Sequence, residues 1–362
     1  MATAFTSSFS QPYYLTSSFP KVKATTDRAK VSVEIYYVNE AQESSTKIYE
    51  GAVYSYGSPR TVELADIGSI VANYFRSKDL SFGKVDIRFA EAHMTLAFLY
   101  CDFTQDSMFA RTKQLLLASA AQRVYPDSSV AWATIPSDDA STAFTIRAVG
   151  HRADGSVTVV TKEETKDLIN IRAEFVVQEI IDWARNLTDA ETGDDLVDVT
   201  FFSIEAHGKQ KLCYIIPQAP HLHFSFRNIF NIKEYIDIVG TMVTKTELSH
   251  DTAVCGGTAV QYDRSISRTY QVTTEPIPTE EVALYEQFLT SHDISILADS
   301  RFTKAIITEH TAEPSNDDGS LTTFKFSWRF ASERPYIFRS PLDGFLPPKG
   351  NVFNDVFSQE YD

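Results

Sequence analysis

Residues 221–231 read HLHFSFRNIFN, residues 244–297 read TKTELSHDTAVCGGTAVQYDRSISRTYQVTTEPIPTEEVALYEQFLTSHDISIL, and residues 322–338 read TTFKFSWRFASERPYIF. These stretches hold the densest run of strand and turn signals in the chain. In the last one, Phe324, Phe326 and Trp328 alternate with polar residues, the period of two that indicates a half-buried strand. Residues 219–337 are therefore predicted to form a β-rich domain.

One helix is predicted inside this domain, at residues 279–291. Thr279 is a favourable N-cap, and Glu280 and Glu281 follow in the first turn, where negative charge suits the helix dipole. Gly240, Gly256-Gly257 and Asp263-Arg264-Ser265 are turn signals. They predict that the segment before the helix divides into three or four strands.

Two earlier segments share one plan with each other. Residues 30–104 and residues 131–218 each contain strands, one amphipathic helix and a closing β-hairpin. The helices are predicted at residues 62–77 and 172–186, where apolar residues recur every three or four positions. The sequence therefore predicts a mainly β fold with a few helices (α+β), built from tandem β-sandwich-like domains, each with a covering helix. The shared order suggests that the second domain is a degenerate duplication of the first.

Three segments lie outside these domains. Residues 1–29 are rich in Ser, Thr and aromatic residues and are predicted to be an N-terminal arm that docks on a neighbour or a disordered leader. Residues 105–130 are predicted to be a helical linker. Residues 338–362 combine proline with aromatic residues and are predicted to be a C-terminal arm that wraps a neighbour or its own domain.

Composition narrows the class of protein. The chain has 362 residues, of which 43% are hydrophobic, so several cores can be buried. Lys and Arg number 33 and Asp and Glu number 48, a formal net charge of −15. This acidity argues against a nucleic-acid partner, because phosphate contacts need clustered cations. No apolar run approaches the roughly 18 residues of a membrane span, and the N-terminus lacks the charged and apolar regions of a secretory signal.

The three cysteines, Cys101, Cys213 and Cys255, have no metal-binding spacing, and an odd number argues against a disulfide framework. Each is interpreted as a small buried apolar residue, consistent with synthesis in a reducing cytoplasm. Cys255 beside His250 and Asp251 could form a thiol nucleophile with a base. A hairpin or bulge at Cys255-Gly256-Gly257 is the favoured interpretation, because no helix N-terminus is available to lower the thiol pKa.

A metal site is the other chemistry considered. His221 and His223 stand two apart on a predicted strand, so both side chains would share a face, with a third ligand from His207, His250, His292 or a carboxylate. No spacing identifies that third ligand, and a structural or surface pair is favoured. Asp317-Asp318-Gly319 is interpreted as a β-turn, because the spacing of a calcium-binding loop is absent. We therefore predict no catalytic, cofactor-binding or metal-ligating residues and no cofactor.

The third domain resembles structural tail proteins of phages and prophages of gut Bacteroidetes. The resemblance lies in FRNIFN (226–231), in TYQVTTEP (269–276) followed by PTEEVALYEQFLTSHDI (278–294), and in TFKFSWRFASERPYI (323–337). It covers about a third of the chain, and the upstream domains do not match the usual layout of a distal tail protein. The resemblance implies a β-rich, ring-forming tail or baseplate component without enzymatic activity.

Two functions from different classes follow as expectations. The first is a non-enzymatic virion protein made in the bacterial cytoplasm, which joins copies of itself in a ring, with six copies expected, and contacts neighbouring tail proteins. The second is a carbohydrate- or host-surface-binding module, as in an adhesin or receptor-binding protein. The second needs exposed aromatic residues, but Trp132, Trp183 and Trp328 all lie within predicted strands or a helix, where burial is expected. A β-rich hydrolase lacks a recognisable site.

Overall fold

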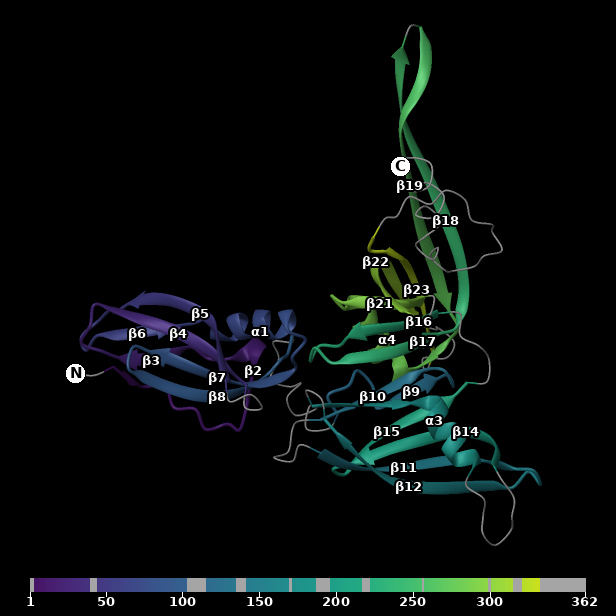
Figure 1. Ribbon diagram of the computed structural model, residues 1–362, viewed down its shortest axis with the longest axis horizontal. Helices are drawn as coiled ribbons and strands as arrows, with labels where there is room; N and C mark the ends of the chain where they lie inside the picture. Colours follow the sequence, from purple (N-terminus) through teal and green to yellow (C-terminus); the bar gives the residue numbers. More distant parts are fainter. Residues whose placement is uncertain are drawn as a thin grey trace, which may run out of the picture.

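The computed structural model describes residues 3–39, 44–102, 115–134, 141–168, 171–186, 196–216, 222–255, 257–298, 301–314 and 321–332. The chain is mainly β-structure with three α-helices in the described part (Figure 1). It forms two β-sandwich units, here called unit 1 (residues 3–102) and unit 2 (residues 115–216), and a third domain (residues 222–332). A long two-stranded hairpin projects from the third domain (Figure 1).

Unit 1 packs a five-stranded sheet against a three-stranded sheet. Valines and isoleucines of both sheets form one core, with Val33 and Ile87 on the large sheet and Val22 and Val62 on the small one. One helix covers this core. The large sheet has the order β2(Tyr14–Leu15)-β8(Ala92–Leu99)-β7(Phe82–Phe89)-β4(Lys30–Asn39)-β5(Ser44–Tyr54), the small one β1(Ala4–Phe5)-β3(Val22–Thr25)-β6(Thr61–Leu64), and the helices are η1(Thr16–Ser18) and α1(Ile67–Ser77).

Unit 2 packs a five-stranded sheet against a two-stranded sheet and a helix. Its core holds Trp132 and Phe175 from the small sheet against Phe144 and Phe202 from the large one. The large sheet has the order β12(Val157–Asp167)-β11(Ser141–Arg152)-β14(Leu196–Ala206)-β15(Lys209–Ile215)-β9(Ala121–Val124), the small one β10(Ser129–Ala133)-β13(Arg172–Val176), and the helix is α3(Val177–Arg185).

The two units have the same topology. Unit 1 has one additional strand, β1, which pairs with β3 and has no counterpart among the described strands of unit 2. When β1 is set aside, a short first strand in each unit pairs in parallel with the last strand, β2 with β8 and β9 with β15. In each, an outer hairpin (β4–β5 or β11–β12) and a closing hairpin (β7–β8 or β14–β15) pair antiparallel through their first strands. The small sheet pairs the second strand with the strand before the helix, β3 with β6 and β10 with β13. The two units therefore share one order of eight elements, and their origin by duplication stays a prediction.

A tyrosine and a cysteine are adjacent near the closing hairpin of each unit, but their positions are not equivalent. Tyr100-Cys101 follows the last strand of unit 1, whereas Cys213-Tyr214 lies inside the last strand of unit 2.

The third domain is one large antiparallel sheet with a helix against it. Its core brings together Phe224, Phe288, Phe326 and Trp328 from strands and helix. The sheet order is β17(Lys233–Ile238)-β16(Leu222–Arg227)-β21(Ile294–Ala298)-β22(Arg301–Pro314)-β23(Leu321–Phe330)-β19(Thr258–Thr274)-β18(Gly240–Cys255), with β20(Ile277–Pro278) on β23 and helix α4(Thr279–Thr290).

The N-terminal segment differs from the expected arm. Residues 3–29 belong to unit 1, because β1 pairs with β3 and β2 pairs with β8. Phe19 packs on Phe98 with ring centroids 4.8 Å apart, and Phe5 packs on Phe89 at 5.3 Å. The aromatic residues that suggested a docking surface thus cover the core of their own unit.

Several boundaries also differ from expectation. The described part of the expected helical linker contains no helix: residues 121–124 form β9. The helices of units 1 and 2 begin about five residues after their predicted starts, because β6 and β13 occupy the first predicted positions.

The third domain also differs from expectation at two places. Pro278, not Thr279, is the N-cap of α4. β19 runs unbroken through Asp263-Arg264-Ser265, with only a bulge opposite Asp251 and Thr252. The expected C-terminal arm, residues 338–362, lies outside the described residues.

Candidate functional site

The first candidate site is a joint at the turn between β16 and β17, residues 228–232. The Asn228 side chain holds this turn, because its Oδ1 accepts the backbone N–H groups of Phe230 at 2.9 Å and Ile232 at 3.0 Å. Asn231 has a φ of 58°, a left-handed conformation that Asn adopts more readily than most residues. These residues belong to the FRNIFN motif, so the motif has a structural role.

The joint fastens the third domain to unit 1. Asn231 Nδ2 donates to the Leu80 carbonyl at 2.9 Å, and the Asn231 carbonyl accepts from the Ser81 hydroxyl at 3.1 Å. The Asp102 N–H donates to the Ile229 carbonyl at 3.0 Å. The neighbouring apolar cluster draws on all three domains, and its members include Leu99, Leu117, Ala131, Phe230 and Ile232.

A buried carboxylate fastens the same joint to unit 2. Glu234 Oε1 accepts from Asn228 Nδ2 and from the Ala118 N–H, each at 2.7 Å. Lys211 Nζ lies 3.7 Å from Glu234 Oε2, and both side chains are only 1% exposed. Burial raises the pKa of Glu234 above its ordinary value, opposed by the Lys211 charge. Such a pair gives orientation more than stability, because both charges lose their hydration.

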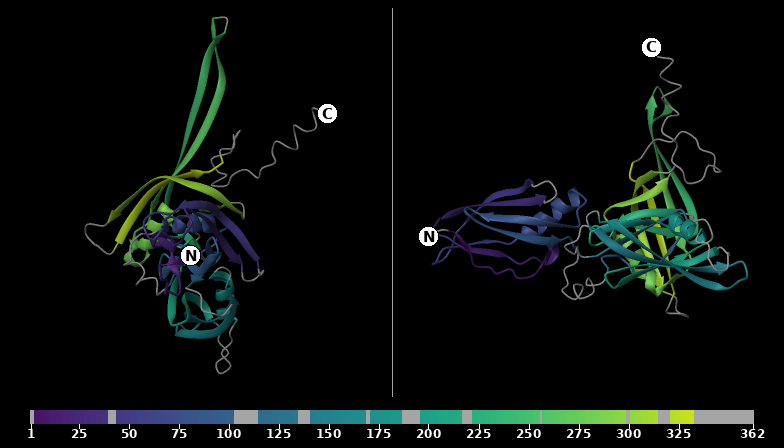
Figure 2. Two further views of the ribbon diagram at one scale, coloured as in Figure 1. Left: turned by 90° about the vertical axis from the view of Figure 1, so that its left-hand side faces the viewer. Right: turned by 60° about the horizontal axis from the view of Figure 1, so that its bottom comes forward.

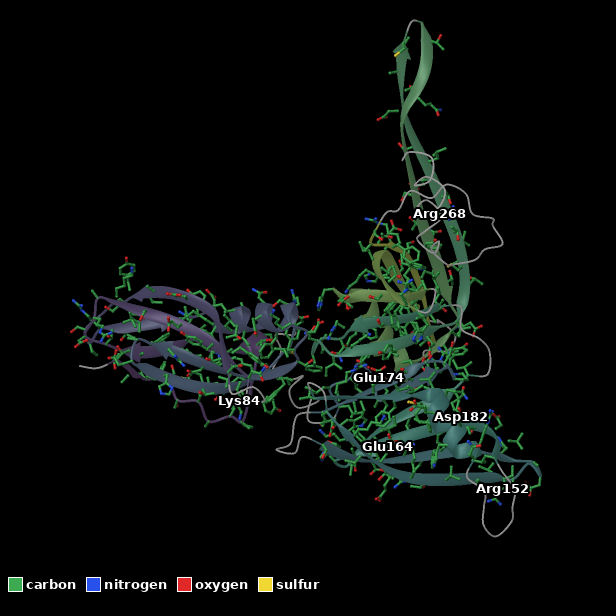
Figure 3. All side chains as sticks on the ribbon, in the orientation of Figure 1. Lys84, Arg152, Glu164, Glu174, Asp182 and Arg268 are labelled. Atoms are coloured by element: carbon green, nitrogen blue, oxygen red, sulfur yellow. The ribbon has the colours of Figure 1, made fainter. Side chains whose placement is uncertain are left out.

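Further polar contacts extend this boundary. Tyr235 OH donates to Glu174 Oε1 at 2.8 Å, and Glu174 lies where unit 2 meets the third domain (Figure 3). Arg123 Nε donates to Glu281 Oε2 at 2.9 Å, which ties β9 to helix α4. The boundary between unit 2 and the third domain is therefore held by specific polar pairs.

A serine, a histidine and an aspartate meet at this boundary without forming a nucleophilic site. Asp237 bonds His223 Nδ1 through one oxygen and accepts from Ser128 Oγ through the other, at 2.5 Å. Ser128 Oγ lies 3.4 Å from that same His223 Nδ1, and Ser128 is buried. A catalytic triad needs the histidine to bridge serine and carboxylate through its two ring nitrogens. Here the carboxylate bridges the other two residues, so the arrangement fits a structural role.

The histidine pair that was considered as a metal site, and for which a structural or surface role was favoured, is described only at His223. His223 Nδ1 bonds the Asp237 carboxylate, and the His223 ring stacks on the Tyr235 ring with ring centroids 5.9 Å apart. His221 and Asp317-Asp318-Gly319 lie outside the described residues. Among the residues that the structure describes, no group of three potential ligands could hold a metal ion.

The cysteines occupy two kinds of environment. Cys101 and Cys213 are buried, and burial raises the pKa of the Cys213 thiol to about 12, so this thiol is unreactive. Cys255 is exposed at the end of β18 and pairs across the hairpin with Thr258. The hairpin interpretation of Cys255 is confirmed, whereas its expected burial is wrong. His250 and Asp251 lie on the same projecting strand.

The second candidate site is the projecting hairpin. β18 and β19 pair over their whole length, from Gly240–Thr274 to Cys255–Thr258. β19 also pairs with β23, but only through residues 270–273, so the outer part of the hairpin is a free two-stranded ribbon. Figure 3 places Arg268 on its shaft, above the sheet of the third domain. Val243, Leu248 and Val254 are exposed along it, Val254 at 75%.

Sequence reasoning missed both sites for identifiable reasons. The joint depends on side-chain bonds of Asn228 and Asn231, which leave no periodic pattern; two asparagines three residues apart between strands were the available signal. The hairpin was divided at Asp263-Arg264-Ser265 because charged residues resemble a turn, although in an exposed ribbon both faces tolerate charge.

Comparisons with known proteins do not identify a family. No family model matches the chain, and no curated protein matches it. A solved structure, "Crystal structure of Dpr2 Ig1-Ig2 in complex with DIP-Theta Ig1-Ig3", aligns over 92% of this chain and 91% of its own at 8% identity, with a TM-score of 0.19. A TM-score this low carries nothing about function. Within the described residues, no helix is long and apolar enough to cross a membrane.

Proposed function

We propose that this protein is a non-enzymatic structural component of an assembly, which joins copies of itself through the β18–β19 hairpin. The single observation that carries this proposal is the hairpin's exposure. A two-stranded ribbon is at best marginally stable alone in water, and a long unpaired edge invites pairing with another chain. A second molecule that pairs with this hairpin would bury its exposed side chains and satisfy its unpaired backbone groups.

The joint supports the same proposal. A projecting hairpin keeps a defined orientation only if its base is fixed. The first strand of the hairpin, β18, follows directly after β17, and β17 carries Glu234 and Asp237. Both carboxylates are buried and bonded to groups of unit 2. These polar pairs fix the orientation of the third domain relative to unit 2. Buried polar pairs are better suited to fixing an orientation than to adding stability, because their groups lose hydration on burial.

The virion setting rests on the resemblance of the third domain to phage tail proteins. On this proposal the chain is a tail or baseplate protein, made in the bacterial cytoplasm, that forms a ring and touches neighbouring tail proteins. Identical subunits that contact one another through two different surfaces close into a ring when the rotation between them allows it. The acidic surface, with a formal charge of −15, favours protein neighbours over nucleic acid.

The carbohydrate-binding alternative receives less support. Trp132 and Trp328 are fully buried, and Trp183 is partly buried beneath Lys162, whose Nζ lies 5.0 Å from its ring centroid. None of the three tryptophans is an exposed side chain; the exposed aromatic side chains of the described residues include Tyr54 and Tyr56 on unit 1.

The test is the mass of the protein in solution with and without the outer hairpin. The shortened variant replaces residues 247–267 by Asn-Gly, so that Thr246 and Arg268 remain paired and the new turn suits a two-residue hairpin. Light scattering and negative-stain images should show multimers for the full chain and monomers for the shortened one. Circular dichroism should be unchanged in the shortened variant apart from the lost strands. The same number of copies per particle in the two proteins would overturn the role of the hairpin in self-association.

A further inference from the structure

We propose that the hairpin of one copy docks on unit 2 of the next copy, along the free edge of β12 and the outer face beside it. This inference rests on the proposed function, since it names the partner surface for the same hairpin. The "acceptor face" is defined here as Val149, Val157, Val159, Phe201 and Tyr214.

The edge of β12 is open for strand addition. β12 ends the order of its sheet, with β11 on one side and no other strand of the described residues on the other. Its first five residues, Val157–Thr161, read VTVVT and carry no charge. Val157 is 65% exposed and Val159 is 58% exposed. An uncharged, β-prone and exposed edge is the kind that proteins normally protect, so its exposure here marks an interface.

An apolar row continues from this edge across the outer face of the sheet. The strand registers place Val159 opposite Val149, Val149 opposite Phe201, and Phe201 opposite Tyr214. The rings of Phe201 and Tyr214 lie 6.1 Å apart, and Tyr214 is 45% exposed. The row crosses four strands; it is exposed at Val159 and Tyr214 and partly buried at Val149 and Phe201 between them. Apolar surface that spans a sheet in this way marks an interaction site.

The equivalent surface of unit 1 has the opposite character. On its outer face Glu34 stands opposite Arg88, and Tyr36 stands opposite Asp86. Its edge strand β5 carries Lys47, whose Nζ bonds Glu34 at 2.6 Å and also Glu50 at 3.0 Å. Charges on an edge strand block strand addition. On β12 they begin only at Lys162, where Lys162 and Lys166 pair with Glu164, so the two units differ in whether the half of the edge before Lys162 can accept a partner.

The placement of the two surfaces favours a second copy as the occupant. The hairpin leaves the molecule at one end, and β12 lies at the other end of the stack formed by unit 2 and the third domain (Figures 1 and 2). A hairpin so placed cannot reach β12 of its own chain. The donor and the acceptor are different surfaces at opposite ends, which is the requirement for a head-to-tail contact between identical subunits.

The hairpin supplies matching chemistry. β18 lies at the end of its sheet order, so its outer edge offers unpaired backbone groups to the unpaired edge of β12. Leu248 and Val254, both exposed, share one face of this strand because they are six residues apart, whereas the exposed Val243 lies on the other face. Pairing along β12 would set Leu248 and Val254 on the face that carries Val157 and Val159, so that the apolar row continues onto the hairpin, and would convert a two-stranded ribbon into part of a larger sheet.

The first experiment compares Val159→Lys with the matched control Ser45→Lys, which places the same charge on the outer face of the edge strand β5 of unit 1, where Ser45 is exposed opposite Val38. We expect Val159→Lys to weaken self-association by at least tenfold in sedimentation or light-scattering titrations, and Ser45→Lys to leave it unchanged. Circular dichroism should match the wild type for both, because both side chains point to solvent. Wild-type association of the Val159→Lys protein would overturn the acceptor face.

A second experiment maps the contact directly. p-Benzoylphenylalanine is introduced in place of Leu248, and the irradiated multimers are digested and sequenced by mass spectrometry. Cross-links to residues 141–167 or 196–215 of another copy are expected. Multimers whose cross-links fall on other strands would overturn this inference while leaving assembly through the hairpin intact. A full-length chain that stays monomeric at every concentration would overturn both.

Discussion

Units 1 and 2 share one topology but differ in how they fill their cores and in what they present to solvent. Unit 2 places Trp132 and Phe175 on its small sheet, where unit 1 has the smaller Ala24 and Val62 and draws Phe5 and Phe19 from its N-terminal segment. Outside, unit 1 carries paired charges, whereas unit 2 combines paired charges, such as Lys162 with Glu164, with an apolar row. A repeated topology can therefore keep its strand order while core and surface are rebuilt separately, since only the alternation of buried and exposed positions is fixed.

The largest effect is expected in the core of unit 2. Trp132→Ala removes a fully buried ring that meets Phe144 edge-on at 5.0 Å, and the loss should cost about 3–5 kcal/mol of unfolding free energy. Phe19→Ala in unit 1 should cost less, because Phe19 is only partly buried. Urea unfolding followed by hydrogen exchange, resolved by unit, measures both. Equal losses would remove the proposed difference between the two cores.

The joint is expected to show the next largest effect. Asn228→Ala removes the side chain that accepts from the N–H groups of Phe230 and Ile232 and that donates to Glu234. The loss of these hydrogen bonds should lower the free energy of unfolding by about 1–3 kcal/mol. Exchange at residues 115–118 and 228–234 should rise first. Thr290→Ala serves as a control, since its hydroxyl bonds only the carbonyl of Glu286 on an exposed helix surface. Unchanged exchange at the joint would exclude Asn228 as its organiser.

Unit 1 and the joint should respond to pH in opposite directions. Burial raises the pKa of Glu234, so its protonated form favours the folded state, and this contribution is present at low pH and is lost as pH rises. The Lys47 hydrogen bond lowers the pKa of Glu34, and the Lys21 hydrogen bond lowers that of Glu63. Their contribution is present at neutral pH and is lost on acidification.

Between pH 7 and pH 4, unit 1 should therefore lose stability relative to the boundary between unit 2 and the third domain. Denaturant titrations with unit-resolved exchange check this, and Glu234→Gln should remove the gain at the boundary. Parallel changes in both regions would show that Glu234 is not the controlling group.

The smallest effect is expected on the charged face of unit 1. Glu34→Ala removes the carboxylate that Lys47 and Tyr36 contact, but the group is exposed and the pair is screened by salt. The melting temperature in 1 M salt should not be distinguishable from that of the wild type, and the solution mass should not change. A change in mass would mean that unit 1 also carries an interface.

The sequence predicted the elements whose side chains alternate or repeat, and it missed those that depend on partners distant in the chain. The alternation in residues 321–330 identified β23, and the acidic first turn with Glu280 and Glu281 identified the third helix. β6 and β13 were merged with the helices that follow them, because apolar residues such as Val62 and Leu64 fit both periods. The role of residues 3–29 was missed, because Phe19 gains its partner Phe98 only in the folded unit. The candidate sites depend on exposure and on Asn side-chain bonds, which no periodicity encodes.

The most direct test of self-assembly through the hairpin is the mass of the full-length protein measured by light scattering over a wide concentration range. Self-assembly through the hairpin predicts species at multiples of the 40.6 kDa chain mass, with rings or short stacks in negative-stain images of the same fraction. A single 40.6 kDa species at every concentration would contradict it.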